Sequence, residues 1–305
     1  MRVKPLFLCA LAGLMAAGSA QAQELTGTLK KVKETGAITI GYRESSVPFS
    51  YLDDNQKPIG YAMDICYKVV DAVKDDLKLD KLDVKLVPVS SSTRIPLMAN
   101  GTIDLECGST TNNVERQKQV AFTNSHFLTA SRFVSKKASK IDSIDGLKGK
   151  SVVSTSGTTN IKQVVEANAA RGLNLTVLPS KDHAEGFLMV ETDRAAAFVM
   201  DDILLAGLIA GSKNPSAYVI SKDGFSLPEP YGIMLRKDDP AFKAVVDKAT
   251  AALYTSPEGV AIYDKWFMKP IPPKGLVMNV PLEGAMKQAL AHPSDSPDPA
   301  DYIVK

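Results

Sequence analysis

The stretch Asp104–Arg116, DLECGSTTNNVER, decides which kind of fold and which kind of site this chain carries. A short apolar strand ends at Gly108, and the missing side chain there lets another segment approach closely. Hydroxyl residues follow, and an asparagine pair then offers a cap for a helix that carries Arg116. Because the stretch has no nucleophile–base pair and no set of metal ligands, it predicts a binding site for a small charged molecule.

Residues 1–22 have the composition of a secretion signal. Two basic residues come first, an apolar core spans residues 6–18, and Ala20 and Ala22 supply small residues before a cleavage site. The apolar core is too short for a membrane-spanning helix. We therefore expect export with cleavage and a periplasmic location.

The charge of the chain is balanced. The leader contains two of the 36 basic residues and no acidic residue, so 34 basic and 34 acidic residues remain after it. This balance argues against nucleic acid or an anionic membrane as the partner. The remaining length of about 280 residues predicts about two domains.

The cysteines allow two interpretations. Cys9 lies in the leader, which leaves Cys66 and Cys107. In an oxidising compartment an even pair favours one disulfide, and two free buried thiols are the alternative.

Strand and helix patterns alternate along the chain. Apolar periodicity predicts strands over 37–42, 85–89 and 103–107, and a helix over 61–77. The alternation restarts with strands over 150–154, 175–179, 195–200 and 231–236, and with helices from about 160, over 183–192, 203–209, 240–254 and 257–267. Two α/β units with mainly parallel sheets are therefore expected. The Pro-, Asp- and Ser-rich tail, residues 293–305, is expected to be mobile.

Polar clusters follow the predicted strands at their carboxyl ends, where open α/β sheets bind ligands. They contain Arg43, Ser91 to Arg94, Ser109 to Arg116, Thr155 to Thr159, His183 and Asp201. Topology alone would place polar loops at that edge. Arginines at three such strand ends indicate an anionic ligand as well.

Short motifs also occur in a fixed order, namely Val47–Tyr51, Gly60–Asp64, Asn100–Asp104, Thr111–Arg116 and Phe122–Thr123. Together they resemble the signature of the family-3 extracellular solute-binding proteins, the soluble receptors of polar amino-acid ABC importers. The resemblance covers roughly residues 35–270. Longer strings look like the glutamate/aspartate-binding branch: Arg43–Tyr51, Glu106–Gln119, Ser156–Thr159, Lys181–His183 and Met200–Gly207.

The resemblance implies a type II periplasmic-binding-protein fold, in which two lobes close on a ligand like a hinged clamp. The crossing strands are expected near residues 127–131 and 227–232. Lobe 1 would comprise residues 23–128 and 232–292, and lobe 2 residues 129–231. A monomer that delivers an acidic L-amino acid to membrane permease components is implied, with no cofactor and no metal.

The resemblance assigns the ligand's α-carboxylate to Arg116, whose guanidinium matches a carboxylate as a two-pronged donor. Thr155 and Thr159 would meet the same carboxylate from the other lobe, where a helix start attracts anions. This loop lacks the lysine and glycine spacing of a phosphate-binding loop. An exposed, unliganded arginine is the alternative interpretation of Arg116.

The ammonium group is assigned to Asp201, together with the carbonyl of Ser109 and the hydroxyl of Thr111. The neighbouring Asp202 is expected to cap a helix instead.

The distal carboxylate is assigned to Arg43, Ser91, Arg94 and His183. Two arginines that converge without an anion would repel each other, so their presence favours an acidic side chain in the ligand. A partly exposed residue at a helix start is the alternative for His183.

Two rival functions remain. A dehydratase of the same fold, acting on prephenate or arogenate, would need a general acid or base, for which His183 and Glu106 are the candidates. The sensor portion of a signalling receptor is the other, but nothing in the sequence after residue 22 is apolar enough to cross a membrane. We expect a binding protein and no catalytic residue.

Overall fold

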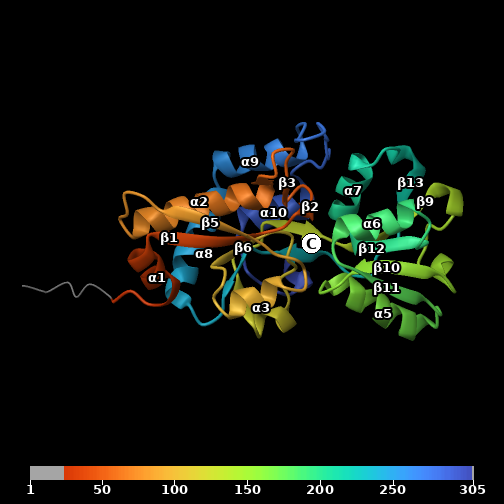
Figure 1. Ribbon diagram of the computed structural model, residues 1–305, viewed down its shortest axis with the longest axis horizontal. Coiled ribbons are helices and arrows are strands. Elements are labelled where there is room, and N and C mark those ends of the chain that lie inside the picture. Colours follow the sequence, from red (N-terminus) through yellow and green to blue (C-terminus); the bar gives the residue numbers. More distant parts are fainter. Residues whose placement is uncertain (1–23, 304–305) are drawn as a thin grey trace, which may run out of the picture.

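The computed structural model of the chain describes residues 24–303, and the predicted signal peptide lies outside the described residues. Two α/β halves, each built on a five-stranded sheet, lie end to end along the long axis of the molecule (Figure 1). The chain starts in one half, passes into the other, and returns to the first.

The first sheet has the order β5-β1-β6-β15-β7 and consists of β1 (Ala37–Tyr42), β5 (Asp83–Pro88), β6 (Leu105–Cys107), β7 (Val120–Phe122) and β15 (Met234–Arg236). The second has the order β11-β10-β12-β9-β13 and consists of β9 (Ser131–Lys136), β10 (Ser151–Thr155), β11 (Thr176–Ser180), β12 (Ala197–Asp201) and β13 (Tyr218–Ile220). A small sheet contains β2 (Ser45–Ser46), β3 (Ser50–Leu52) and β4 (Pro58–Ile59).

In each five-stranded sheet a single strand runs against the others. The strands β15 and β9 pair antiparallel with both of their neighbours, whereas β5, β1 and β6 are parallel, as are β11, β10 and β12. Two further strands, β8 (Phe127–Thr129) and β14 (Glu229–Tyr231), pair antiparallel with each other outside the five-stranded sheets. The reversed strand β9 directly follows β8 in the chain, and the reversed strand β15 directly follows β14. The chain therefore crosses between the halves twice, and each crossing delivers a strand from the opposite direction. The expected α/β, two-lobed fold with mainly parallel sheets is confirmed.

The helices flank both sheets. The first half contains α1 (Gly27–Thr35), α2 (Tyr61–Asp76), α3 (Arg94–Ala99), α4 (Val114–Gln117), α8 (Pro240–Tyr254), α9 (Pro257–Phe267) and α10 (Gly284–Ala291). The second half contains α5 (Thr159–Arg171), α6 (His183–Glu191) and α7 (Asp202–Gly211). Side-chain caps begin α4, α5, α6, α8 and α9, at Asn113, Thr158, Asp182, Asp239 and Ser256.

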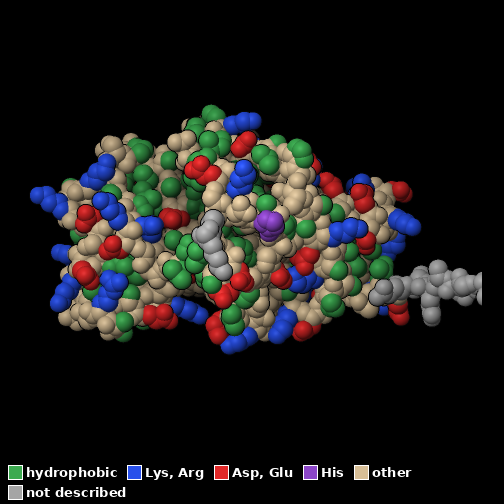
Figure 2. Space-filling view, turned by 180° about the vertical axis from the view of Figure 1, so that it is seen from behind, with side chains coloured by type: hydrophobic (Ala, Val, Ile, Leu, Met, Phe, Trp, Pro, Cys, Tyr) green, Lys and Arg blue, Asp and Glu red, His purple; other side chains and the backbone are tan. Residues whose placement is uncertain are grey.

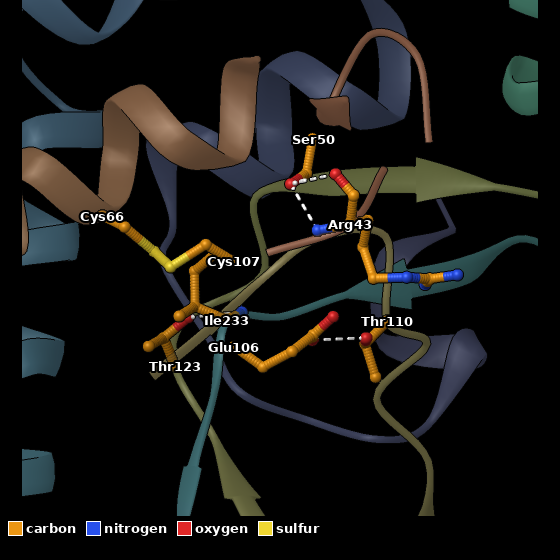
Figure 3. The surroundings of a disulfide bond; sticks show 8 residues. All are labelled: Arg43, Ser50, Cys66, Glu106, Cys107, Thr110, Thr123 and Ile233. Carbon is orange, nitrogen blue, oxygen red and sulfur yellow. Dashed lines mark hydrogen bonds between the residues drawn. A yellow bond between two sulfur atoms is a disulfide. The ribbon is translucent and has the colours of Figure 1, made fainter. Parts of the chain in front are cut away.

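The expected disulfide between Cys66 and Cys107 is confirmed. It joins α2 to the end of β6, and both residues are buried. Figure 3 shows the side chain of Glu106 pointing toward Thr110, away from the disulfide. The bridge therefore fixes the strand end from which the first polar cluster begins.

The run over 231–236, expected as one strand, is divided between two sheets. Tyr231 ends β14, which pairs with β8, and Met234 begins β15 of the first sheet. Gly232 lies at the division, where an added Cβ would stand 3.1 Å from the Cβ of Phe122. Apolar character alone could not show that this run changes sheets.

The tail beyond residue 292 also differs from its prediction. The carbonyl of Ser294 accepts a hydrogen bond from the Ser125 N–H at 2.8 Å, and Asp295 pairs with the Lys243 ammonium at 2.8 Å. The buried Tyr302 hydroxyl lies 2.9 Å from the Ser125 hydroxyl. These contacts are polar and involve the backbone, so the apolar pattern of the sequence did not reveal a packed segment.

Charged side chains of both signs are intermixed over the face of the molecule in Figure 2, as the balanced composition predicts. Across residues 24–303, no helix is both long and apolar enough to span a bilayer. The same part of the chain brings no three His, Cys, Asp or Glu residues together as a metal site.

Candidate functional site

Most of the predicted site residues converge on one small cavity between the two halves. The first half contributes the segments that follow β5 and β6, together with α3 and α4, and the second half contributes β12 and the starts of α5, α6 and α7. The lining consists of Ser91, Arg94, Ser109, Thr111, Arg116, Thr158, Thr159, Asn160, His183, Met200, Asp201 and Leu204. Parallel strands that end at a common edge explain why residues so distant in sequence meet here.

Arg43 and Thr155 are the predicted residues that stand behind this lining. The Arg43 guanidinium donates to the Ser91 hydroxyl at 2.8 Å, and the same nitrogen lies 3.4 Å from Nε2 of His183. The Thr155 hydroxyl lies 3.0 Å from Nδ1 of His183. Thr155 therefore orients the histidine, whereas the prediction placed it against a carboxylate.

Arg94 is held by Thr110 and Glu106, which are hydrogen-bonded to each other. Its Nη1 donates to the Thr110 hydroxyl at 2.5 Å, and this hydroxyl donates to the Glu106 carboxylate at 2.6 Å. The Arg94 guanidinium and the Glu106 carboxylate lie 4.0 Å apart, and both side chains are buried. Glu106 is thus engaged with Thr110 and lies against Arg94, which leaves it unsuited to act as a free catalytic base.

Arg116 reaches the cavity from the short helix α4. Its backbone N–H donates to the cap residue Asn113 at 2.9 Å, and its Nη1 donates to the Thr111 carbonyl at 2.7 Å. Its Nη2 donates to the Gly157 carbonyl at 3.3 Å, which belongs to the second half. Arg116 therefore touches both sides of the cavity, and the exposed-arginine alternative does not describe it.

The three arginines are buried close together, with exposed fractions of 2% for Arg43, 2% for Arg94 and 8% for Arg116. Burial and the charge of Arg94 lower the pKa of Arg43 to about 10 and that of Arg116 to about 9. Both values lie above neutral pH, so both groups stay charged. Concentrated positive charge of this kind favours an anion in the cavity.

Several donors of this cluster have no hydrogen-bond partner within residues 24–303. They are Nη1 of Arg43, Nε of Arg94 and the Ser109 hydroxyl. A buried donor without an acceptor costs about 1–3 kcal/mol. These groups are therefore available for a ligand's oxygen atoms.

Asp201 supplies the negative end of the cavity. Its carboxylate accepts hydrogen bonds from the Asn160 amide at 2.8 Å and from the Tyr231 hydroxyl. Burial raises the pKa of Asp201, while these hydrogen bonds oppose the rise. Asp202 is the first residue of α7 rather than its cap, and its carboxylate accepts from the Thr129 hydroxyl of the first crossing strand at 2.7 Å.

Gly157 lets the two halves approach each other beside the cavity. Its φ of +78° is a conformation that residues with side chains rarely adopt. An added Cβ would stand 2.6 Å from the Cα of Ser92, on the opposite half. A residue other than glycine would hold the two sides apart at this point.

The lining also contains residues to which the sequence assigned no individual role. Thr158, Asn160, Met200 and Leu204 complete it. Asn160 follows the helix start that the hydroxyl cluster marks, and a search for polar residues within one turn of that start would have found it. The apolar Met200 and Leu204 carry no such signal because their type is ordinary for a buried strand and helix.

Comparison with known proteins agrees with this geometry. The model of the bacterial extracellular solute-binding proteins, family 3, matches residues 38–269. The L-glutamate/L-aspartate-binding protein of Pseudomonas aeruginosa is 50% identical over 297 residues, which cover 97% of this chain and 98% of the relative. The glutamate/aspartate import solute-binding protein of Escherichia coli is 47% identical, with 93% of this chain and 95% of the relative covered.

A solved structure shares the fold. The ancestral amino acid-binding protein AncCDT-1, described as a precursor of cyclohexadienyl dehydratase, has a TM-score of 0.67 and 26% identity. The match covers 79% of this chain and 99% of that structure. This fold therefore occurs in an amino acid-binding protein that is described as the precursor of a dehydratase. The fold alone cannot distinguish a binding protein from a dehydratase, so the residues of the cavity must do so.

Proposed function

Because the chain belongs to the family-3 bacterial extracellular solute-binding proteins, we propose that it binds L-glutamate and L-aspartate between its two lobes. The proposal includes delivery of the ligand to the membrane components of an ABC amino-acid importer. The observation that carries the ligand assignment is the convergence of the buried Arg94, Arg116 and Asp201 on one cavity, with Arg43 buried behind it on Ser91.

The charges of an acidic amino acid match this arrangement. Arg116 and Thr159 would hold the α-carboxylate, and Asp201 with the Ser109 carbonyl and Thr111 hydroxyl would hold the ammonium group. The distal carboxylate would lie among Arg43, Ser91, Arg94 and His183, where the unpartnered guanidinium nitrogens of the two arginines supply donors. Thr155 would act through His183.

A dehydratase is not favoured. His183 is the remaining acid–base candidate, and burial together with the charge of Arg43 lowers its pKa well below the ordinary value. A histidine held neutral, with one ring nitrogen against Thr155 and the other against Arg43, serves as a hydrogen-bonding group rather than as a proton donor. The relatives with high identity are both named as binding proteins, and one of them as an import solute-binding protein.

We further propose the lobe boundaries expected from the sequence, with residues 129–231 as lobe 2 and the two flanking segments, 23–128 and 232–292, as lobe 1. The crossings would be β8 and β14. A cleaved leader over residues 1–22, a periplasmic location and a monomeric state complete the proposal.

A thermal-shift screen of the twenty amino acids tests the ligand. At a ligand concentration of about 1,000 times Kd, binding stabilises the folded chain by about 4 kcal/mol, which raises Tm by several degrees. L-glutamate and L-aspartate should give the largest shifts, and their amides much smaller ones. A largest shift from a neutral or basic amino acid would contradict the proposed ligand.

A further inference from the structure

Glu229 is a buried carboxylate beside the cavity that the ligand assignment does not use. It lies on the second crossing strand, β14, and is 8% exposed. One of its oxygens lies 3.4 Å from the Thr111 hydroxyl and 3.4 Å from the Thr159 hydroxyl. Its other oxygen accepts a hydrogen bond from the Gln163 amide.

These partners come from opposite sides of the cavity. Thr111 follows β6 of the first sheet, whereas Thr159 and Gln163 lie on α5, which packs on the second sheet. The hydroxyls of Thr111 and Thr159 are themselves 3.5 Å apart. Glu229 therefore joins the two halves at the point where they meet.

We propose that Glu229 is a further member of the binding site, which bridges the two lobes and takes up one proton when an acidic amino acid binds. The proton passes from the buffer to the carboxylate, and no other bond is made or broken. This inference rests on the proposed function, because it requires a ligand that carries net negative charge.

The charged and titratable groups around Glu229 determine its pKa. Asp201 of β12 faces it with like charge, and Arg116 of α4 faces it with opposite charge. Tyr231 of β14 is also within electrostatic range of Glu229, and Asp202 of α7 accepts a hydrogen bond from Thr129, the residue that pairs with Glu229 across β8 and β14. Burial and the charge of Asp201 raise the pKa of Glu229 to about 7, while Gln163 and Arg116 oppose the rise.

Ligand binding changes this balance toward the protonated form. A ligand carboxylate at Arg116 would compete for the cation that favours ionised Glu229 and would place a second negative charge nearby. The Thr159 hydroxyl, which is assigned to the ligand's α-carboxylate, has one hydrogen, so it cannot donate fully to Glu229 and to the ligand at once. A protonated Glu229 removes the repulsion and donates a hydrogen bond itself.

The sign of the pH dependence follows. Since the complex holds more protons than the free protein, affinity falls as pH rises through the pKa of free Glu229. With that pKa at about 7, L-glutamate should bind about tenfold more weakly at pH 8 than at pH 6, with uptake of about 0.5 proton at pH 7.

Calorimetry tests this directly. Titration of the wild-type protein with L-glutamate at pH 7, in two buffers of different ionisation enthalpy, counts the protons taken up. The Glu229→Gln variant, which mimics the protonated form, should show no uptake and a flat affinity between pH 6 and pH 8. At pH 8 it should bind about tenfold more tightly than the wild type, whereas a merely structural role predicts weaker binding at every pH.

Glu34→Gln is the matched control, because Glu34 is exposed on α1 and should leave the proton count and the pH profile unchanged. Binding of L-glutamate without proton uptake by the wild type, or uptake that persists in Glu229→Gln, would overturn the role of Glu229 alone. Absence of any L-glutamate binding would overturn the proposed function and this inference with it.

Discussion

Replacement of Arg116 by alanine should weaken L-glutamate binding by about 30- to 5,000-fold. Truncating one partner of a buried, hydrogen-bonded charge pair costs about 2–5 kcal/mol, and much of this is the penalty of leaving the other charge unpaired. Arg116 is buried and also donates to Gly157 of the opposite half, so the variant loses a contact between the lobes as well. Calorimetric titration measures the effect.

Two further variants test whether the effect of Arg116→Ala is specific to the guanidinium group of Arg116. Arg116→Lys keeps the charge but loses the planar two-pronged donor, so a partial loss is expected. Arg171→Ala removes an exposed arginine of α5 and should leave the affinity unchanged. A loss of less than about tenfold in Arg116→Ala, with a native melting profile, would mean that Arg116 does not meet the α-carboxylate.

Replacement of Arg94 by glutamine should weaken L-glutamate by about 30- to 1,000-fold and weaken neutral amino acids far less. Arg94 belongs to the proposed distal site, which a neutral ligand does not need. Titration of the variant with L-glutamate and with L-glutamine measures both losses. Equal losses for the two ligands would place Arg94 outside the distal site.

Glu106 complicates this substitution, because it lies 4.0 Å from Arg94 and would lose its counter-charge. The double variant Arg94→Gln with Glu106→Gln removes both charges together. The double variant should regain thermal stability relative to Arg94→Gln yet still fail to prefer L-glutamate over L-glutamine. Recovery of that preference would show that the single variant acted through the stranded Glu106.

The architecture was largely accessible from the sequence because it follows from periodicity. The helix over 61–77 and the strands over 37–42 and 150–154 are displaced by at most one residue in the structure. The division of residues 231–236 between two sheets was not accessible, since residues 231–235 form one uninterrupted run without a charged residue. The packed tail was missed for the opposite reason, because polar contacts hold it.

The site was predictable to the extent that strand ends and residue types specify it. Arginines at strand ends pointed to the cavity, and Arg94 and Arg116 line it. Orientation is what the sequence lacked. Thr155 faces His183 rather than the cavity, and Glu229, between two prolines on a crossing strand, gave no sign that it would meet Thr111.

The charges of the cavity explain its proposed selectivity. Three buried guanidinium groups lie near the carboxylates of Glu106, Asp201 and Glu229. Burial raises the pKa of Asp201, and burial together with the charge of Asp201 raises the pKa of Glu229. Partial protonation of Glu229, whose pKa lies at about 7, leaves positive charge in excess. A ligand with two carboxylates and one ammonium group neutralises that excess, whereas a ligand with a neutral side chain leaves a guanidinium unpaired.

Calorimetric titration of the wild-type protein with L-glutamate and with L-glutamine tests this claim most directly. The two ligands differ in one distal group, and the amide presents an NH2 donor to side chains that themselves donate. The mismatch costs about 2–4 kcal/mol, so L-glutamate should bind roughly 30- to 1,000-fold more tightly. An affinity for L-glutamine within tenfold of that for L-glutamate would contradict it.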